Sequence, residues 1–426
     1  MSVMLFQPPE GFLDASISVP GSKSIANRAL ICALLSQGES RITGLPDGDD
    51  TAVILDVLDQ MKRVTKVDAS VIVSGSREVK LPGIIDAHLA GTSSRFLTAV
   101  AALGVNTCVI DGGAPLRSRP MADLHEALSS MGANVVPLGD VGHLPVSVEA
   151  GNMRGGRISI RGDVSSQFIS ALMLIAPMLD DGLIIEIAGD LVSRSYVEMT
   201  SSVMTEFGAK AIVGVSEIII SPGGYVPCDY AVEPDFSSAA FPLAAVAVRP
   251  GSVRVPGLIQ ASLQGDAEIG NILSAMGCSL LNEYGTYVVS RDDVALSGID
   301  VNMEDCSDLV PAVAVSMLFA RSQSRITGVG FIRKKESDRL GDLAHELQKI
   351  GADIEVEEDG LLIRPLQRPQ PALLETHHDH RLAMAFSLLS LAVPGVKISD
   401  PGVVSKSWPS FFADMEPILG ASSQQH

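Results

Sequence analysis

The stretch SKSIANRALICALL, residues 22–35, begins with polar residues and continues as an apolar run of helical length. Ser22 is a residue type that favours helix N-termini, where free backbone N–H groups can bind an anion. Ser24 and Arg28 are four residues apart and share a helical face, so a hydroxyl and a guanidinium could bind one phosphate or carboxylate. For one isolated stretch, a capped helix with solvated Lys23 and Arg28 is the more common structure.

The same pattern, a polar start followed by an apolar helix, recurs along the whole chain. Its six copies, spaced by 70 to 72 residues, align on Ser24, Ser94, Ser166, Ser238, Asp308 and His380. Amphipathic helices that end near a glycine lie between them, each followed by a strand-like run. Each unit therefore contains strands, one buried helix and one amphipathic helix. A solenoid is the alternative, but solenoid repeats are usually shorter than about 50 residues.

We therefore predict an α/β fold in which six βαβαββ units are grouped three to a domain. The boundary is expected near VPCDYAVEPD, residues 226–235. A chain of 426 residues, of which 46% are hydrophobic, is long enough for two or more packed cores.

Charge and cysteine usage narrow the class of protein. The formal net charge of −19 repels nucleic-acid phosphates and anionic lipids, so neither is an expected partner. The five cysteines are far apart and form no CxxC pair, which argues against a disulfide framework and a structural zinc site. The N-terminal sequence lacks the pattern of a secretory signal, and the apolar runs are too short to span a bilayer. We expect a soluble, cytoplasmic protein.

The starts of the apolar helices carry the candidate chemistry. Buried helix ends need polar caps, so any single polar start is more often structural than functional. Arg95, His380 and Arg381 exceed what capping requires. Two further clusters, RSRPM at 117–121 and FIRKKESDRL at 331–340, add cations where a loop leads into a helix. A solvated ion-pair face is the alternative for each cluster alone, but their repetition favours a common anion site.

The run HHDH, residues 377–380, is a candidate for metal binding. No second group of metal-ligating residues accompanies it, and the adjacent Arg381 would repel a cation. The sequence contains no P-loop, no dinucleotide-binding GxGxxG after a strand and no GxSxG elbow. We therefore predict neither a metal nor a cofactor.

Eight short motifs follow one another along the chain: PGSKSIANRAL, AGTSSR, RSRPM, SSQF, VSRSY, RKKESDRL, DHRLAM and SKSWP. They occur in the order and spacing of the enolpyruvyl transferases, and the chain resembles that family over essentially its whole length. The resemblance implies two globular domains, each an inside-out α/β barrel of three βαβαββ units, with the active-site cleft between them. In that family the N-terminal strands pack with the C-terminal domain, so the expected domains are residues 18–232 and residues 1–17 with 233–426.

Within the family, the motifs are most similar to members that act on shikimate 3-phosphate. The implied reaction transfers the enolpyruvyl group of phosphoenolpyruvate to the 5-hydroxyl of shikimate 3-phosphate and releases phosphate, in the shikimate pathway to chorismate. Protonation of the vinyl carbon gives its neighbour cationic character, the hydroxyl attacks there, and the tetrahedral adduct loses a proton and phosphate. This path needs a proton donor, a proton acceptor, and cations that hold two phosphates and a carboxylate.

The resemblance also assigns the candidate site residues to the two substrates. Those on the shikimate 3-phosphate side are Lys23, Ser24, Arg28, Ser165, Ser166, Gln167, Ser193, Asp308 and Lys335. Those on the phosphoenolpyruvate side are Lys23, Gly91, Arg119, Gln167, Arg339, Arg381 and Lys406. The expected catalytic residues are Lys23, Asp308, Glu336 and His380, with Asp308 reaching the reacting hydroxyl. The two substrates are the expected partners, and we expect a monomer.

Some positions depart from the family pattern, and others help to distinguish this chain from two alternatives, a sister enzyme and a non-catalytic relative. Leu89 stands where the family usually has Asn, which affects the phosphoenolpyruvate contacts and sensitivity to glyphosate, although Gly91 is of the sensitive kind. The sister enzyme acting on UDP-N-acetylglucosamine typically has a cysteine where this chain has Ala114, and a Lys-Asn pair in place of Lys23 and Ser24. A non-catalytic anion-binding relative would not need a set of proton-transfer groups.

Overall fold

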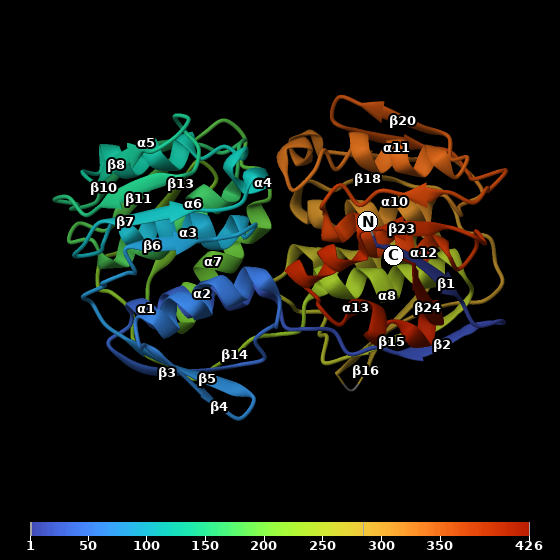
Figure 1. Ribbon diagram of the computed structural model, residues 1–426, viewed down its shortest axis with the longest axis horizontal. Coiled ribbons are helices and arrows are strands. Elements are labelled where there is room, and N and C mark those ends of the chain that lie inside the picture. Colours follow the sequence, from blue (N-terminus) through green and yellow to red (C-terminus); the bar gives the residue numbers. More distant parts are fainter. Residues whose placement is uncertain (1, 284, 426) are drawn as a thin grey trace. The chain divides into compact units, whose positions relative to one another are not determined.

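The computed structural model describes residues 2–283 and 285–425, and the chain divides into two compact units. One unit, here called the continuous unit, is Gly21–Glu233. The other, here called the split unit, combines Met1–Pro20 with Pro234–His426 (Figure 1).

Each unit contains, among its described residues, three four-stranded sheets. Those of the continuous unit, in spatial order, are β14 (Tyr230–Ala231), β3 (Gly38–Thr43), β5 (Ser70–Gly75) and β4 (Val64–Val67); β6 (Ile84–Asp86), β7 (Cys108–Asp111), β9 (Val146–Glu149) and β8 (Asn134–Pro137); and β10 (Gly156–Arg161), β11 (Leu183–Ala188), β13 (Glu217–Ile220) and β12 (Ala211–Val213).

Those of the split unit are β2 (Leu13–Ser16), β15 (Gly251–Pro256), β17 (Thr286–Arg291) and β16 (Ser279–Glu283); β18 (Asp300–Asn302), β19 (Ser324–Thr327), β21 (Gly360–Ile363) and β20 (Ile354–Glu357); and β22 (Leu373–Leu374), β23 (Lys397–Ser399), β1 (Val3–Gln7) and β24 (Ala421–Gln425).

All six sheets share one topology. In each, the first two strands pair in parallel and the other pairings are antiparallel. A parallel pair needs a crossover, which in α/β proteins is usually a helix. The predicted α/β fold of βαβαββ units is therefore confirmed.

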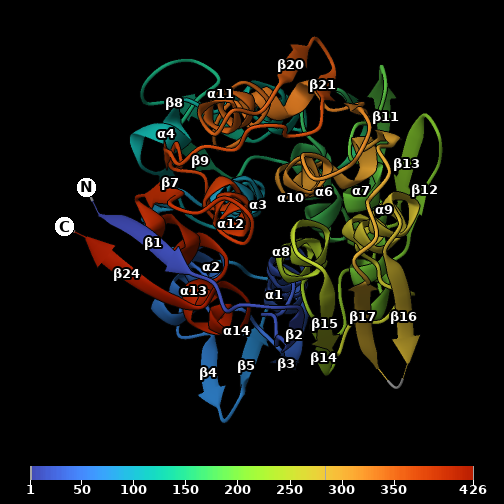
Figure 2. The same cartoon turned by 90° about the vertical axis from the view of Figure 1, so that its right-hand side faces the viewer.

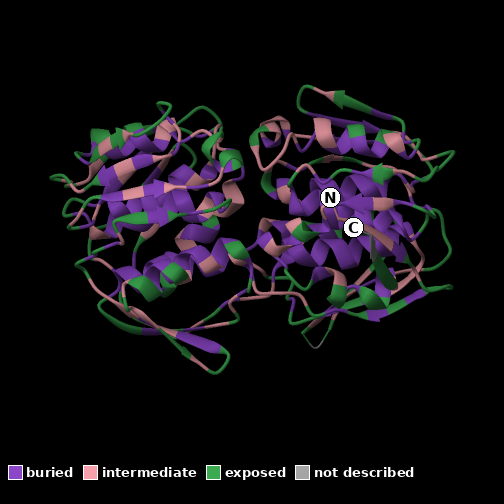
Figure 3. Ribbon diagram, in the orientation of Figure 1, coloured by how far each residue is buried: buried purple, intermediate pink, exposed green. Residues whose placement is uncertain are grey.

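One buried helix from each repeat contributes to the core of its unit. These helices are α1 (Lys23–Leu35), α3 (Gly91–Ala101) and α6 (Ser166–Ile175) in the continuous unit, and α8 (Phe236–Val248), α10 (Val310–Met317) and α12 (His380–Leu389) in the split unit. The three helices of each set contact one another, and Figure 3 colours them as buried along almost their whole length. This burial agrees with their apolar sequences, since a helix that is apolar on all sides belongs in a core.

In five of the six repeats the second helix is amphipathic, as the spacing predicts. These helices are α2 (Asp49–Gln60), α5 (Ala122–Ser130), α7 (Arg194–Glu206), α9 (Ile269–Met276) and α11 (Gly341–Lys349). The remaining short helices are α4 (Ala114–Arg117), α13 (Phe411–Asp414), α14 (Glu416–Leu419), η1 (Ala176–Met178), η2 (Gly265–Glu268), η3 (Glu304–Leu309), η4 (Gly330–Lys334) and η5 (Pro401–Lys406).

The N-terminal strands complete two sheets of the split unit. β1 lies between β23 and β24, with Val3 opposite Ser399 and Gln425. Figure 2 shows β1 and β24 side by side. β2 pairs in parallel with β15, with Leu13 opposite Gly251. Each sheet would otherwise lack one strand of the common four-strand pattern, so these segments belong to the split unit although they precede the continuous one.

Across residues 2–283 and 285–425, we find no helix that combines the length and the apolar character needed to cross a bilayer.

Candidate active site

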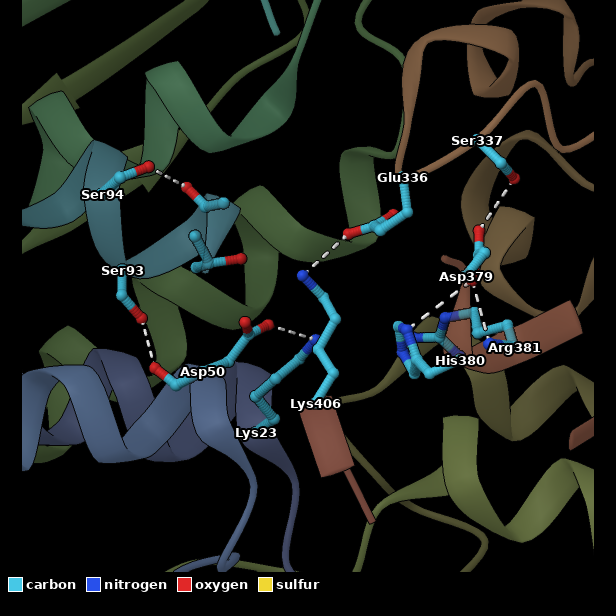
Figure 4. Close-up of polar contacts among 12 residues, drawn as sticks. Lys23, Asp50, Ser93, Ser94, Glu336, Ser337, Asp379, His380, Arg381 and Lys406 are labelled. Atoms are coloured by element: carbon cyan, nitrogen blue, oxygen red, sulfur yellow. Dashed lines mark hydrogen bonds and ion pairs between the residues drawn. The ribbon is translucent and has the colours of Figure 1, made fainter. Parts of the chain in front are cut away.

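In the continuous unit, Lys23 is held at the first residue of α1. Its Nζ atom lies 2.8 Å from Asp50 Oδ2, and the two side chains are 15% and 3% exposed (Figure 4). Ser22 occupies the N-cap position as predicted, but its hydroxyl makes no capping hydrogen bond. The Ser22 Oγ atom is buried, and no described residue is its hydrogen-bond partner.

Sequence reasoning missed Asp50, although a signal was present. Asp50 lies in the first turn of α2, in line with Val53, Ile54 and Val57 on the apolar face of that helix. A carboxylate at such a position must be buried, and a buried carboxylate needs a cation or hydrogen bonds. Ser93 Oγ of α3 donates to the Asp50 backbone oxygen at 2.5 Å, which ties α2 to α3 beside Lys23 (Figure 4).

Arg28 lies inside the continuous unit, where only 1% of its surface is exposed. Its guanidinium donates to Thr200 Oγ1 at 2.7 Å, Ser170 Oγ at 3.1 Å and the Tyr196 backbone oxygen at 3.2 Å. Burial lowers the pKa of Arg28 to about 10, so it remains charged at neutral pH. In this structure Arg28 bonds the backbone oxygen of Ser24, at 2.7 Å, and it joins α1 to α6 and α7.

The start of α3 lies against two guanidinium groups. Gly91 is so close to them that a Cβ atom added there would lie 2.5 Å from Arg119 Nη1 and 2.9 Å from Arg95 Nη1. Arg95 also donates to the Gly91 backbone oxygen at 2.9 Å. Gly91 and Arg119, the two residues of the second repeat that we predicted for phosphoenolpyruvate, therefore lie next to each other.

The start of α6 carries three further predicted residues. Ser165 is the N-cap of α6, and its hydroxyl accepts the Gln167 N–H at 3.3 Å. Gln167 Nε2 donates to Thr92 Oγ1 of α3 at 3.2 Å, while its buried Oε1 has no hydrogen-bond partner among the described residues. Ser166 is the first residue of α6, and Ser193 is the N-cap of α7 in a left-handed conformation with φ 54°.

In the split unit, the predicted residues Asp308 and Glu336 both contact the buried guanidinium of Arg339. Arg339 Nη1 lies 2.7 Å from Asp308 Oδ1, its Nη2 lies 2.7 Å from Glu336 Oε2, and its Nε lies 2.7 Å from Asp379 Oδ2. Arg381 Nη2 lies 2.8 Å from Asp308 Oδ2. We call these five residues the Arg339 cluster.

The cluster is built from loop-to-helix junctions of two repeats. Asp308 lies in η3 just before α10, Glu336 and Arg339 lie between η4 and α11, and Asp379 is the N-cap of α12, whose second residue is Arg381. Asp379 Oδ1 accepts the Arg381 backbone N–H at 2.9 Å. One carboxylate thus caps the helix and holds the central arginine.

The cluster keeps Asp308 and Arg339 charged. Burial alone would raise the pKa of Asp308, but Arg381, Lys335 and Arg339 hold it well below its usual range. Burial alone would lower the pKa of Arg339, but Asp379, Glu336 and Asp308 raise it above its usual range. The cluster therefore presents fixed charges of both signs at neutral pH.

Other predicted residues of the split unit lie beside the cluster. Lys406, the last residue of η5, has its Nζ atom 3.5 Å from Glu336 Oε1 (Figure 4). His380 is 1% exposed, with Nδ1 3.6 Å from Asp379 Oδ1. Lys335 follows η4 directly, and its ammonium lies 5.6 Å from the centre of the Phe331 ring.

We expect Arg339→Gln to lower the free energy of unfolding by about 3–5 kcal/mol, because it leaves buried Asp379 without its main cation. Urea unfolding followed by circular dichroism measures this. Arg364→Gln is the matched control, since Arg364 is an exposed partner of Asp353 at 2.9 Å and should cost less than about 1 kcal/mol. Equal losses from both substitutions would contradict the structural role of Arg339.

One group in the described residues has the spacing of metal ligands. Ligand atoms of Glu346, Glu375 and His377 all lie within 4.8 Å of one another. Both oxygens of Glu346 already accept hydrogen bonds from Lys349, at 2.8 and 2.7 Å, and this ammonium would oppose a cation. From HHDH, only His377 joins this group.

The fold defines the chain as an α/β protein of six βαβαββ units in two domains, with charged residues at the starts of its helices. The family description for EPSP synthase (3-phosphoshikimate 1-carboxyvinyltransferase) matches residues 9–415. The chain belongs to the EPSP synthase family.

Individual relatives agree with this assignment. A 3-phosphoshikimate 1-carboxyvinyltransferase of Nostoc punctiforme is 38% identical over 408 residues, covering 94% of this chain and 95% of the relative. One from a Shewanella species is 36% identical over 419 residues, covering 95% and 96%. Two solved structures of EPSP synthase from Acinetobacter baumannii cover both chains completely, with TM-scores of 0.84 and 0.83 at 24% and 23% identity, which shows a shared fold.

Proposed function

We propose that this chain transfers the carboxyvinyl group of phosphoenolpyruvate to the 5-hydroxyl of shikimate 3-phosphate, releasing phosphate, and that the residues described above carry the reaction. The observation that carries the assignment of roles is the Arg339 cluster with Lys406. It brings three cations, Arg339, Arg381 and Lys406, into ion pairs with two carboxylates. Asp308 pairs with both arginines, and Glu336 pairs with Arg339 and Lys406. Family membership over nearly the whole chain supports the reaction itself.

Substrate binding uses the cations. Two phosphates and a carboxylate need several cationic donors, and each charge-assisted hydrogen bond contributes about 1.5–3 kcal/mol. We assign Arg119, Arg339, Arg381 and Lys406 to phosphoenolpyruvate, together with Gly91 and Gln167. We assign Ser24, Arg28, Ser165, Ser166, Ser193 and Lys335 to shikimate 3-phosphate, with Gln167 shared. Lys23 contacts both substrates.

Proton transfer uses Lys23, Asp308 and Glu336. Asp308 lies between two arginines and accepts the proton of the attacking hydroxyl, whereas Glu336, between Arg339 and Lys406, exchanges a proton with the methylene carbon. Lys23 is a cation within reach of a carboxylate, Asp50, that can share its proton. His380 assists at the phosphate end.

Phosphorus NMR tests the activity directly. The protein is mixed with shikimate 3-phosphate and phosphoenolpyruvate, and we expect inorganic phosphate and a new enol ether signal to appear together. UDP-N-acetylglucosamine in place of shikimate 3-phosphate is the control acceptor and should give no phosphate. Turnover with the control acceptor alone would overturn the proposed substrate.

We expect Gly91→Ala to raise KM for phosphoenolpyruvate by about tenfold or more, because its methyl group would displace the Arg119 guanidinium and weaken a charge-assisted contact. KM for shikimate 3-phosphate should change much less. Gly83→Ala is the control, since no atom lies within 4 Å of a Cβ at that position. An unchanged KM for phosphoenolpyruvate in Gly91→Ala would remove Arg119 from that subsite.

We further propose that the chain works as a monomer in the cytoplasm. Its cysteines form no disulfide among the described residues, which agrees with a reducing compartment. Sedimentation equilibrium at enzyme concentrations used for assays tests the oligomeric state.

A further inference from the structure

Asp266 is a buried carboxylate of the split unit to which the mechanism above gives no role. It lies in η2 and is 3% exposed. Its Oδ2 atom accepts a hydrogen bond from Ser237 Oγ in the first turn of α8. Its Oδ1 atom is buried and has no hydrogen-bond partner among the described residues. Burying a carboxylate with one oxygen unsatisfied is costly, so packing alone does not explain this residue.

The surroundings of Asp266 connect it to the Arg339 cluster. The segment η2 packs directly on η3, which carries Asp308, and on the start of α8. The charged groups that act on Asp266 are Asp308 from η3, Arg381 from α12 and Asp235, the N-cap of α8. Cys306 of η3 also faces it, and burial together with Asp266 raises the pKa of that thiol, so the thiol stays neutral.

The two neighbouring carboxyl groups have opposite charge preferences. Burial, and next the negative charge of Asp308, raise the pKa of Asp266 to about 7, although Arg381 and Ser237 oppose this. Asp308 stays ionised because Arg381, Lys335 and Arg339 outweigh its burial. Asp266 is therefore the carboxyl group of this pair that changes its charge near neutral pH.

We propose that Asp266 is a positioning residue that acts on the reaction through Asp308 and Arg381. Its buried carboxylate opposes negative charge on Asp308 and attracts the Arg381 guanidinium. The inference rests on the proposed role of Asp308 as acceptor of the hydroxyl proton. Three cations make Asp308 a weak proton acceptor, and a second anion beside it offsets part of their effect. When Asp266 is protonated, this help is absent.

The expected consequence is a step in the pH dependence of turnover. As pH rises through about 7, Asp266 ionises, Asp308 becomes a better proton acceptor and kcat increases. Asp266→Asn keeps the size of the side chain and an oxygen that can accept from Ser237, but it cannot ionise. We expect its kcat to be about tenfold below wild type at pH 8 and nearly equal at pH 6, with both KM values changed less than about twofold.

Stability supplies a readout that separates this role from a structural one. The pKa of Asp266 is raised in the folded state, so the unfolded state gives up this proton first, and stability falls as pH rises from the unfolded value to about 7 and then levels off. Asp266→Asn should therefore melt at a higher temperature than wild type at pH 8, with a smaller difference at pH 5. A variant that is more stable but slower at pH 8 cannot owe its slowness to misfolding.

Two further variants complete the test. Ser237→Ala removes the hydrogen bond that favours the ionised form, so the midpoint of the kcat step should move to higher pH. Asp292→Asn, at an exposed position of the same unit, should leave the pH profile of kcat and the melting temperature unchanged. Wild-type turnover by itself tests the proposed function. Asp266→Asn turnover equal to wild type at pH 8, or an equal loss at pH 6 and pH 8, would overturn the role of Asp266.

Discussion

Lys23→Met is expected to lower kcat by about 100-fold or more, since it removes a cation and a proton-transfer group that we place against both substrates. The ammonium lies 2.8 Å from Asp50 and is largely shielded from water, so no solvent ion can take its place at low cost. Turnover is measured as phosphate release at saturating concentrations of both substrates. Near-normal activity would contradict the role given to Lys23.

The pairing with Asp50 allows stability and activity to be separated. Lys23→Met leaves the buried Asp50 carboxylate without this ammonium, and some loss of stability is expected. In the double variant Lys23→Met with Asp50→Asn, the melting temperature should recover while kcat stays low. Lys66→Met, at an exposed position of the same unit, is the control and should behave as wild type. Recovery of kcat in the double variant would show that the effect of Lys23 is structural.

Glu336→Gln is expected to reduce kcat by about 100-fold or more, because an amide cannot exchange a proton with the substrate. The substitution keeps the shape of the side chain and an oxygen that can accept from Arg339 Nη2, which lies 2.7 Å from Glu336. Shikimate 3-phosphate affinity, measured by calorimetry, should change little, so the loss should fall on kcat.

Two comparisons make the Glu336 result specific. Glu358→Gln changes an exposed glutamate of the same unit and should leave turnover unchanged. Glu336→Ala also removes the contacts with Arg339 and Lys406, so it should weaken phosphoenolpyruvate binding in addition to slowing turnover. If Glu336→Gln retained most of its kcat, proton transfer would have to be assigned to another group.

The repeat pattern allowed much of the fold to be predicted. The apolar helix of residues 22–35 and its copies are recognisable because helix periodicity depends only on neighbours a few residues apart. Strand pairing is different. Nothing local in residues 3–7 or 13–16 indicates that they join sheets whose other strands lie in the last 180 residues or so of the chain.

The candidate site was predicted unevenly for a similar reason. Motif resemblance named Asp308, Glu336, Arg339 and Arg381, and the structure brings all four together. It did not name Asp50 or Asp266, whose relevance comes from burial beside charged groups that only the fold brings near: Lys23 for Asp50, and residues of other repeats for Asp266. The sequence also placed Arg28 on one helical face with Ser24, and it gave no sign that α6 and α7 hold the guanidinium inside the unit, as they do in this structure.

The amino-acid sequence by itself determined the six-fold repetition, the type and place of the helices, and the family whose motifs the chain carries. Each of these depends on short runs of residues, which can be recognised without knowing what they contact in the folded protein. Only the tertiary structure decided which strand completes which sheet, which carboxylate meets Lys23 and how Arg339 joins residues of different repeats. These are contacts across long sequence separations, and their energies depend on burial that arises only once the helices have packed.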